Sequence, residues 1–249
     1  MELNEEELEE LKKILLMPIV HIRGKNKIEI DFENNQIRST GEKDQDMSDV
    51  AQQFYKVLYD FKDDSWLKNG FAGDTMNSCK YACKIVSEEK REEWNSKYHC
   101  LANFWVLPSE VGRSTFKDYS KNSGGVQSPT IASFNKGRKD YMDRFLDIYM
   151  NEEKFYQERY PSYYQEFPKD KFGDKHFITG IFIDDDKKVI SFSKISETEK
   201  VNLKYAVENI IDVLIGKIEE RASSISNSDK AEMLRDLFYV NICNDIKDN

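Results

Sequence analysis

Hydrophobic residues recur at helical spacing in several separate stretches of the chain. Residues 5–16 carry one apolar stripe, and Pro18 is expected to end the helix that this stripe predicts. A second helix is predicted after Ser48, which is a suitable capping residue. The helical pattern returns over 140–159 and is clearest over 196–221. On that long helix the apolar face comprises Leu203, Val207, Ile210, Ile211, Leu214 and Ile218. The chain is therefore predicted to be mainly helical.

The C-terminal region is predicted to form a pair of helices, 196–246. The turn formers SSISNSD separate the long helix from a last helix that carries Leu234, Leu237 and Phe238. We expect this pair to pack on the rest of the domain, and in particular on the helix at 140–159. Burying one large apolar side chain contributes about 1.5–3 kcal/mol, so the stripe on the long helix is expected to be central to stability.

Strand-like patterns are fewer. Ile28, Ile30 and Phe32 alternate with two acidic residues, which predicts a half-buried strand near 27–32. The apolar segments HFITGIFI and KKVISFSKI flank DDDKK, so a β-hairpin is predicted over 176–195, with a broken helix as the competing interpretation.

Between these elements, residues 33–46 are rich in turn formers and predict a polar loop, whereas 76–107 predict a helical region with interruptions. No internal repeat or low-complexity linker divides the chain. The expected fold is one α+β domain over 1–249, predominantly helical, with a small β component.

Composition narrows the class of protein. The 249 residues are 39% hydrophobic, which is enough for a substantial core. The net charge of −9 argues against a non-specific DNA-binding protein, which needs clustered Lys and Arg. The N-terminus lacks the basic flank and apolar segment of a signal peptide, and no window approaches the about 20 apolar residues of a membrane span. We therefore expect a soluble, reduced, cytoplasmic protein, and the Lys-, Asn- and Ile-rich usage is typical of AT-rich bacterial genomes.

The cysteines do not form a recognisable metal motif. Cys79 and Cys83 would share one face of a helix, with His99 and Cys100 a short distance downstream. A structural zinc site needs four such ligands, and the usual C-x2-C pairing is missing. Buried free thiols are the simpler interpretation, so we predict no metal and no cofactor.

Polar residues that interrupt apolar segments are the candidate functional residues. Under one hypothesis they form a cleft for an anionic or nucleotide-like ligand, with His99 and Asp143 as catalytic groups and Arg113 as the anion contact. Under the other they form a buried hydrogen-bonded network between helices. A structural role for His99 is favoured because no acid adjoins it. The candidate ligand-binding residues are Asp74, Asn77, Asn103, Arg113, Arg138 and Arg144.

Known nucleolytic arrangements fit these residues poorly. Arg91 and His99 have seven residues between them, more than the spacing of the Arg and His in helical RNases of the HEPN type. An HNH nuclease usually places its general-base His beside an acid, and no Asp-His or Glu-His pair occurs in the chain. The G-x-S-x-G, Walker A and G-x-G-x-x-G motifs are missing as well.

Short segments nevertheless resemble a bacterial family of unknown function. The order IDFENN, TGEKDQD, YHCLANFWVLP and TIASFNKGRKDYMDRF is similar to the IDF…GKDPD…YH-like segment of that family, its His-containing apolar segment ending in Pro, and its TIN-x-ARG…DRFD-like helix start. The resemblance covers most of 28–195. An ungapped match puts Ala132 and Asn135 where the family has Asn and Arg, and a gapped match uses Asn135 and Arg138. Asp143, Arg144 and Phe145 match.

The resemblance implies an architecture and no established activity. Its apolar His-containing segment is also similar to the tail of restriction-type HNH domains. We therefore expect a non-catalytic bacterial protein that acts as a protein-interaction or ligand-sensing module, through a protein partner or as a homodimer. The alternative is a defence-associated nuclease or nucleotide-processing enzyme with a degenerate HNH-like site, which would bind a nucleotide or nucleic acid. No membrane contact is expected.

Overall fold

The fold begins with the helix that the sequence predicts. α1 (Glu5–Leu16) is capped by Asn4: its side-chain oxygen accepts from the Glu7 backbone N–H at 3.0 Å, and the Glu7 carboxylate accepts from the Asn4 N–H at 3.0 Å. The predicted stripe of α1 faces the core. The residues that the computed structural model describes are 3–24, 27–41, 45–77, 79, 85–108, 145–146, 149–151, 153–190, 196 and 198–242.

A three-stranded sheet follows α1. Its order is β1-β3-β2, with β1 (Ile19–His21) parallel to β3 (Gln36–Ser39) and β2 (Ile28–Asp31) antiparallel to β3. β2 confirms the strand predicted near 27–32, although Phe32 lies beyond the strand and is 40% exposed.

The prediction of a polar loop over 33–46 was wrong at β3. That segment pairs on both sides through its backbone and contributes the fully buried Ile37 to the core. Its polar neighbours hide the signal because only one of its side chains is large and apolar. The preceding turn is held by Asp31, whose carboxylate accepts from the backbone and the amide of Asn34 at 2.9 and 2.8 Å, and Asn35 adopts a φ of 51°.

A second, two-stranded sheet corrects the helical prediction for 76–107. β4 (Phe71–Thr75) pairs antiparallel with β5 (Phe104–Pro108), a 3-10 turn (Leu101–Asn103) precedes β5, and α4 (Glu88–Asn95) is the only α-helix in the described part of 76–107. Every residue of β5 is buried. A short apolar run that is buried on both faces has no alternation, so its pattern does not separate strand from helix.

α2 (Asp49–Leu58) and the short α3 (Ser65–Lys68) lie against this second sheet. Ser48 occupies the expected N-cap position but donates its hydroxyl to the Gln45 carbonyl at 2.6 Å instead of capping the helix. Gly73 permits the close approach of β4, because a Cβ there would lie 2.3 Å from the Asp46 carbonyl oxygen. The sheet and the α2 region therefore form one packed unit.

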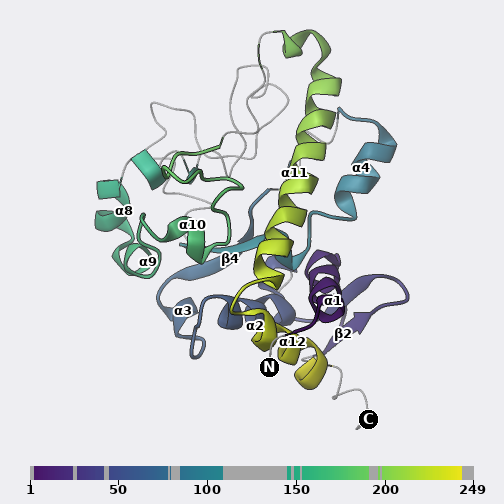
Figure 1. Ribbon diagram of the computed structural model, residues 1–249, viewed down its shortest axis with the longest axis vertical. Helices are drawn as coiled ribbons and strands as arrows, with labels where there is room; N and C mark the ends of the chain where they lie inside the picture. The colour runs from purple at the N-terminus through teal and green to yellow at the C-terminus, as the bar shows by residue number, and fades with distance from the viewer. Residues whose placement is uncertain are drawn as a thin grey trace.

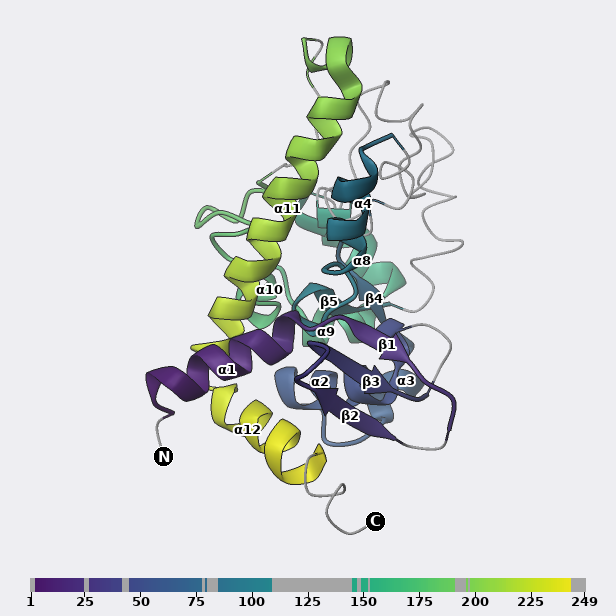
Figure 2. The same ribbon diagram turned by 90° about the vertical axis from the view of Figure 1, so that its right-hand side faces the viewer.

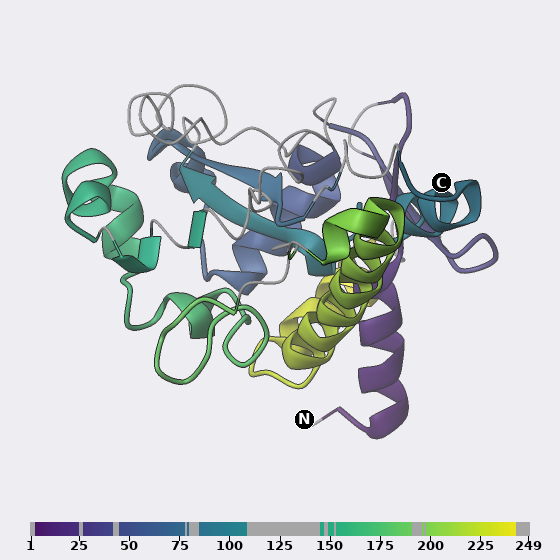
Figure 3. The same cartoon turned by 90° about the horizontal axis from the view of Figure 1, so that it is seen from above.

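The next segment contains α8 (Glu153–Arg159), α9 (Pro161–Glu166) and α10 (Phe172–Lys175). Seen from above, this green segment and the purple α1 lie on opposite sides of the molecule, with the β4–β5 ribbon between them (Figure 3).

The hairpin predicted over 176–195 is reduced to isolated bridges in 176–190, and 191–195 lie outside the described residues. Ile183 pairs antiparallel with Val189 around a turn at DDDKK. The buried residues Ile178, Ile181, Phe182 and Ile183 do not alternate, so the segment cannot bury them as a regular strand.

The long α11 (Leu203–Ser226) runs from the top of the view down to the level of α1 (Figure 1). A 3-10 turn (Glu199–Asn202) precedes it, and α12 (Ala231–Asp236) with a π-helical continuation (Leu237–Ile242) follows. α11 packs chiefly along α1, and α12 packs on α1 and α2 (Figure 2). Much of 140–152 lies outside the described residues, so the expected packing of this pair on the 140–159 helix stays a prediction.

The predicted fold class, α+β and predominantly helical with a small β component, is confirmed. Within the described part of the chain, none of the helices combines the length and apolar character that a bilayer-spanning helix needs.

Candidate functional site

Two of the predicted ligand-binding residues form a buried amide pair. Asn77 and Asn103 are both fully buried, and the Asn77 amide nitrogen lies 3.3 Å from the Asn103 side-chain oxygen. The Asn103 amide nitrogen donates to the carbonyls of Asn77 at 2.9 Å and Tyr98 at 2.8 Å. These bonds connect the segment after β4 to the turn before β5. The amides therefore join two loop segments inside the fold, while the Asn77 Oδ1 has no hydrogen-bond partner among the described residues.

His99 and Asp74 lie close to this pair in the chain but differ in their surroundings. The backbone carbonyl of half-buried His99 accepts from the Ile19 N–H at 2.7 Å, and its ring lies against that of Tyr98 at 3.8 Å between centroids. The half-buried Asp74 accepts from the Thr75 N–H at 2.8 Å and faces Trp105 across the sheet.

The predicted helical region over 76–107 would place His99 and Asn103 one helical turn apart. They do not share a helix, because the segment consists of a bridge, a 3-10 turn and a strand. Arg113, Arg138, Asp143 and Arg144 lie outside the described residues, as do Ala132 and Asn135 of the family match. The cleft that would join these groups to His99 stays a prediction.

A buried cation lies at the centre of the fold, and sequence reasoning missed it. Arg221 on α11 is fully buried. Its Nη1 donates to the carbonyls of Ala102 and Phe104 at 2.7 and 2.8 Å, and its Nε donates to the His176 carbonyl at 2.8 Å. Its Nη2 has no hydrogen-bond partner among the described residues. One guanidinium therefore ties together α11, the turn before β5 and the end of α10.

His176 lies beside this cation with both ring nitrogens engaged. The Tyr59 hydroxyl is 2.8 Å from Nδ1, and the Tyr163 hydroxyl is 3.4 Å from Nε2. Tyr163 donates its own proton to the Val106 carbonyl at 2.9 Å, so its oxygen is left to accept from the imidazole. This assignment places the His176 proton on Nε2 and makes Tyr59 a donor to Nδ1.

The electrostatics of this cluster keep the imidazole neutral. Burial lowers the pKa of His176 well below its ordinary value, and the positive charges of Arg221 and Lys175 lower it further. Burial also raises the pKa of Tyr59 to about 12, although the Arg221 charge opposes that rise. A neutral imidazole between two protonated phenols is a stable hydrogen-bonded arrangement, and the whole cluster is buried.

The signal for Arg221 was present in the pattern of α11. The buried face continues beyond Ile218 through Ala222 and Ile225, and Arg221 lies on that face. A cation inside an apolar stripe predicts a buried, hydrogen-bonded guanidinium. His176 gave a weaker signal, since a single histidine before an apolar run does not reveal its partners.

The described cysteines form no disulfide. Cys79 and Cys100 are buried, and burial raises the pKa of the Cys100 thiol to about 12. Cys79 has a φ of 42° and lies outside any helix, so the expected shared helical face with Cys83 does not form at that residue. The described residues contain no group of three or more side chains that could hold a metal ion.

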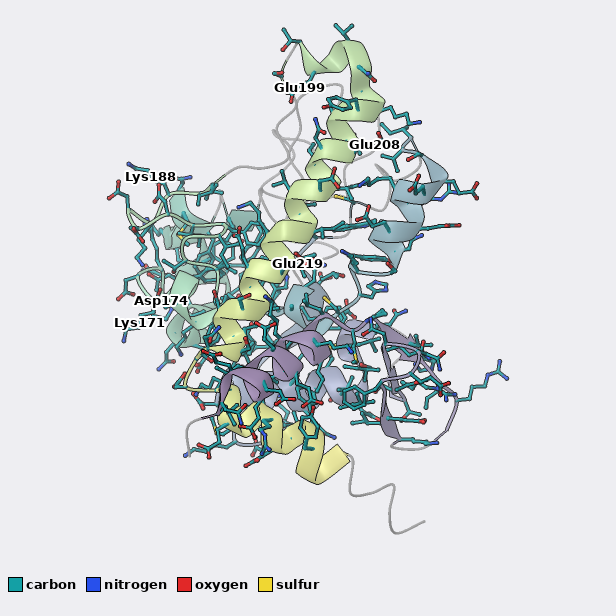
Figure 4. All side chains as sticks on the ribbon, turned by 45° about the vertical axis from the view of Figure 1, so that its right-hand side comes forward. Lys171, Asp174, Lys188, Glu199, Glu208 and Glu219 are labelled. Atoms are coloured by element: carbon teal, nitrogen blue, oxygen red, sulfur yellow. The ribbon has the colours of Figure 1, made fainter. Side chains whose placement is uncertain are left out.

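A pocket of about 380 Å³ lies between α1, the β2–β3 turn, the end of α4 and α11; we call it the α1–α11 pocket. It adjoins the His99 segment, because Ser96 and Lys97 line it. The Lys97 ammonium and the Glu219 carboxylate lie 3.6 Å apart at its rim. Figure 4 shows Glu219 on α11, above α1 in this view. The lining residues are Leu16, Pro18, Asn34, Asn35, Ser96, Lys97, Ile215, Ile218 and Glu219.

No protein-family model, curated protein or solved structure matches this chain. The function is therefore argued from its own residues.

Proposed function

We propose that the protein is a non-catalytic interaction module that acts as a homodimer through the N-terminal half of α11. The observation that carries this proposal is an exposed apolar surface on that half and on the 3-10 turn that precedes it. Val201 of the turn and Tyr205 and Val213 of the helix are 90%, 61% and 46% exposed, although large apolar side chains are normally covered. We call the surface formed by these three residues, Asn209 and the adjoining Gly216 the outer face of α11.

The shape of the molecule supports this use of the outer face. The N-terminal half of α11 rises above both sheets, with α4 along one side (Figures 1 and 2). At 1.5 Å per residue, the eleven residues Leu203–Val213 extend for about 16 Å, or three helical turns, along which a second helix can lie. A Cβ placed on Gly216 would meet nothing within 4 Å, so a second backbone can approach closely there.

The outer face is self-complementary in an antiparallel arrangement. With a two-fold axis at Asn209, Tyr205 faces Val213 of the partner subunit, and the two Asn209 amides face each other. Asp212, at the edge of the outer face, already accepts from the Lys90 ammonium of α4 at 2.6 Å. A second copy of the chain therefore supplies apolar contacts to the outer face.

The candidate residues before β5 also support a non-catalytic role. The amides of Asn77 and Asn103 are buried and directed to each other and to backbone carbonyls. The nitrogen atoms of both amides are engaged in this way, and both side chains are fully buried, so neither faces solvent where a substrate could reach it. We therefore place the function at the surface of α11 and not at this network.

The experiment is a measurement of molar mass by light scattering over a wide range of protein concentration. We expect a mass approaching twice the 29.3 kDa of the chain. The double variant Tyr205→Asp/Val213→Asp should be monomeric, because two carboxylates cannot be buried unpaired in the contact. Met233→Asp is the matched control, since Met233 is a 45% exposed apolar residue on α12.

The control should remain dimeric and both variants should keep the helical circular dichroism of the natural protein. A natural protein that stays monomeric at the highest concentration would overturn the proposal. Equal dimerisation of the double variant would also overturn it, because another surface would then form the contact.

A further inference from the structure

The α1–α11 pocket has an apolar floor of the size that small ligands use. Leu16, Pro18, Ile215 and Ile218 form this floor, and the last two are 7% and 3% exposed. Its volume of about 380 Å³ lies at the lower end of the range of about 300–1,000 Å³ that is usual for ligand pockets. A ligand with an apolar body of a few carbon atoms would cover this floor.

The rim of the pocket favours positive charge. Glu219 contributes a half-exposed carboxylate. The amide nitrogen of Asn34 is directed to Asp31 at 2.8 Å, so its side-chain oxygen is left as the accepting atom. Asn35 adds a second amide at the same turn.

Helix ends add to this effect. α1 ends at Leu16 and α4 ends at Asn95, both beside the pocket, and the C-terminus of a helix carries partial negative charge. Hydrogen-bond acceptors therefore dominate the surroundings of the floor.

The Lys97 ammonium already occupies the position beside the Glu219 carboxylate that favours a cation. Its ammonium lies 3.6 Å from the Glu219 carboxylate, and the two side chains are 42% and 50% exposed. Exposed ion pairs of this length contribute little to stability. A cation that also covers the apolar floor would therefore displace the Lys97 ammonium, which can turn into solvent on its flexible side chain.

We infer that the α1–α11 pocket binds a small organic amine, whose primary ammonium pairs with Glu219 and whose apolar body covers Ile215 and Ile218. The inference goes beyond the proposed homodimer and does not depend on it. Glu219 lies outside the outer face of α11, so the two sites can be tested separately.

The test is isothermal titration of the full chain with phenethylammonium and hexylammonium, and with hexanoate and hexanol as probes of the same apolar length. We expect both ammonium probes to bind, and hexanoate to bind at least about tenfold more weakly, the cost of losing one charge-assisted hydrogen bond. Glu219→Gln should weaken ammonium binding by a similar factor. Glu220→Gln is the matched control, because Glu220 is exposed and does not line the pocket.

Lys97→Met gives a prediction of opposite sign. Removing the resident ammonium should tighten the binding of both ammonium probes several-fold, whereas a pocket selective for anions would lose affinity for hexanoate. The inference is overturned if neither ammonium probe binds, if hexanoate binds as tightly as hexylammonium, or if Glu219→Gln and Glu220→Gln behave alike. The light-scattering mass of each variant, measured in parallel, shows whether the homodimer is retained independently.

Discussion

The two halves of α11 place their side chains in opposite ways. The C-terminal half, Leu214–Ser226, buries a guanidinium in the core, whereas the N-terminal half, Leu203–Val213, exposes Tyr205 and Val213 to solvent. Each half thus departs from the usual distribution of polar and apolar residues. In the C-terminal half the departure is compensated, because three backbone carbonyls accept hydrogen bonds from Arg221.

In the N-terminal half, the described residues leave Tyr205 and Val213 of the outer face exposed. The proposed partner subunit would cover these two side chains. A buried cation such as Arg221 can be satisfied by hydrogen bonds within the fold. Exposed apolar side chains such as Tyr205 and Val213 can be covered only by another molecule.

The largest effect is expected from a change on the inward side of the N-terminal half. Ile211 is fully buried, so Ile211→Asp would place a carboxylate in the core without a partner. We expect this variant to be lost from the soluble fraction on expression. Asn209→Asp, two positions away on the exposed side, should fold normally. Soluble, cooperatively unfolding Ile211→Asp protein would contradict the placement of α11.

The next largest effect is expected at the buried cation of the C-terminal half. Arg221→Met preserves an apolar stem but leaves the carbonyls of Ala102, Phe104 and His176 without their donor. We expect the free energy of unfolding to fall by about 3 kcal/mol, measured by urea denaturation. Arg235→Met is the control, because Arg235 forms a partly exposed ion pair with Glu7 at 2.7 Å and should cost less than about 1 kcal/mol. An equal loss of unfolding free energy in the two variants would show that the buried Arg221 is no more important to stability than a partly exposed arginine.

A smaller effect is expected from acidification. The pKa of His176 is lowered in the folded protein by burial, then by Arg221 and Lys175, so the unfolded chain binds a proton at higher pH than the folded one. The stability is therefore complete above the unfolded pKa of about 6.5 and declines as pH falls below it, with a slope of at most about 1.4 kcal/mol per pH unit.

Tyr59, which contacts one ring nitrogen, stays protonated throughout this range because burial raises its pKa to about 12. Urea unfolding between pH 7.5 and pH 5.5 measures the decline. In His176→Gln the same interval should give a flatter profile, and an unchanged slope would show that other groups cause the dependence.

The sequence predicted the elements whose pattern extends over several turns. α1, α2 and α11 were all expected from apolar residues at helical spacing, and β2 was expected from its alternation. β3 and β5 were missed for opposite reasons, since β3 has too few apolar residues and β5 has them on both faces. Local periodicity reports a strand only when one of its faces is in water.

The polar network was predicted in part. Asn77 and Asn103 were expected in a buried network between helices; they are buried and hydrogen-bonded to each other, but they lie after β4 and in the turn before β5. Arg221 and His176 were missed, because the bond that joins them spans 45 residues of the chain and depends on tertiary contact. The exposure of Tyr205 was hidden for a related reason, since a sequence shows the apolar residue and not what covers it.

The most direct test of the homodimer is cross-linking at its proposed two-fold axis. In Asn209→Cys the two thiols would face each other across the axis, close enough for a disulfide under mild oxidation. We expect a covalent dimer on non-reducing electrophoresis, beyond any background from the four natural cysteines in the unaltered chain. Met233→Cys, exposed on α12, should keep the non-covalent dimer but give no covalent dimer under the same oxidation. No covalent dimer from Asn209→Cys, or equal amounts from both variants, would contradict the account.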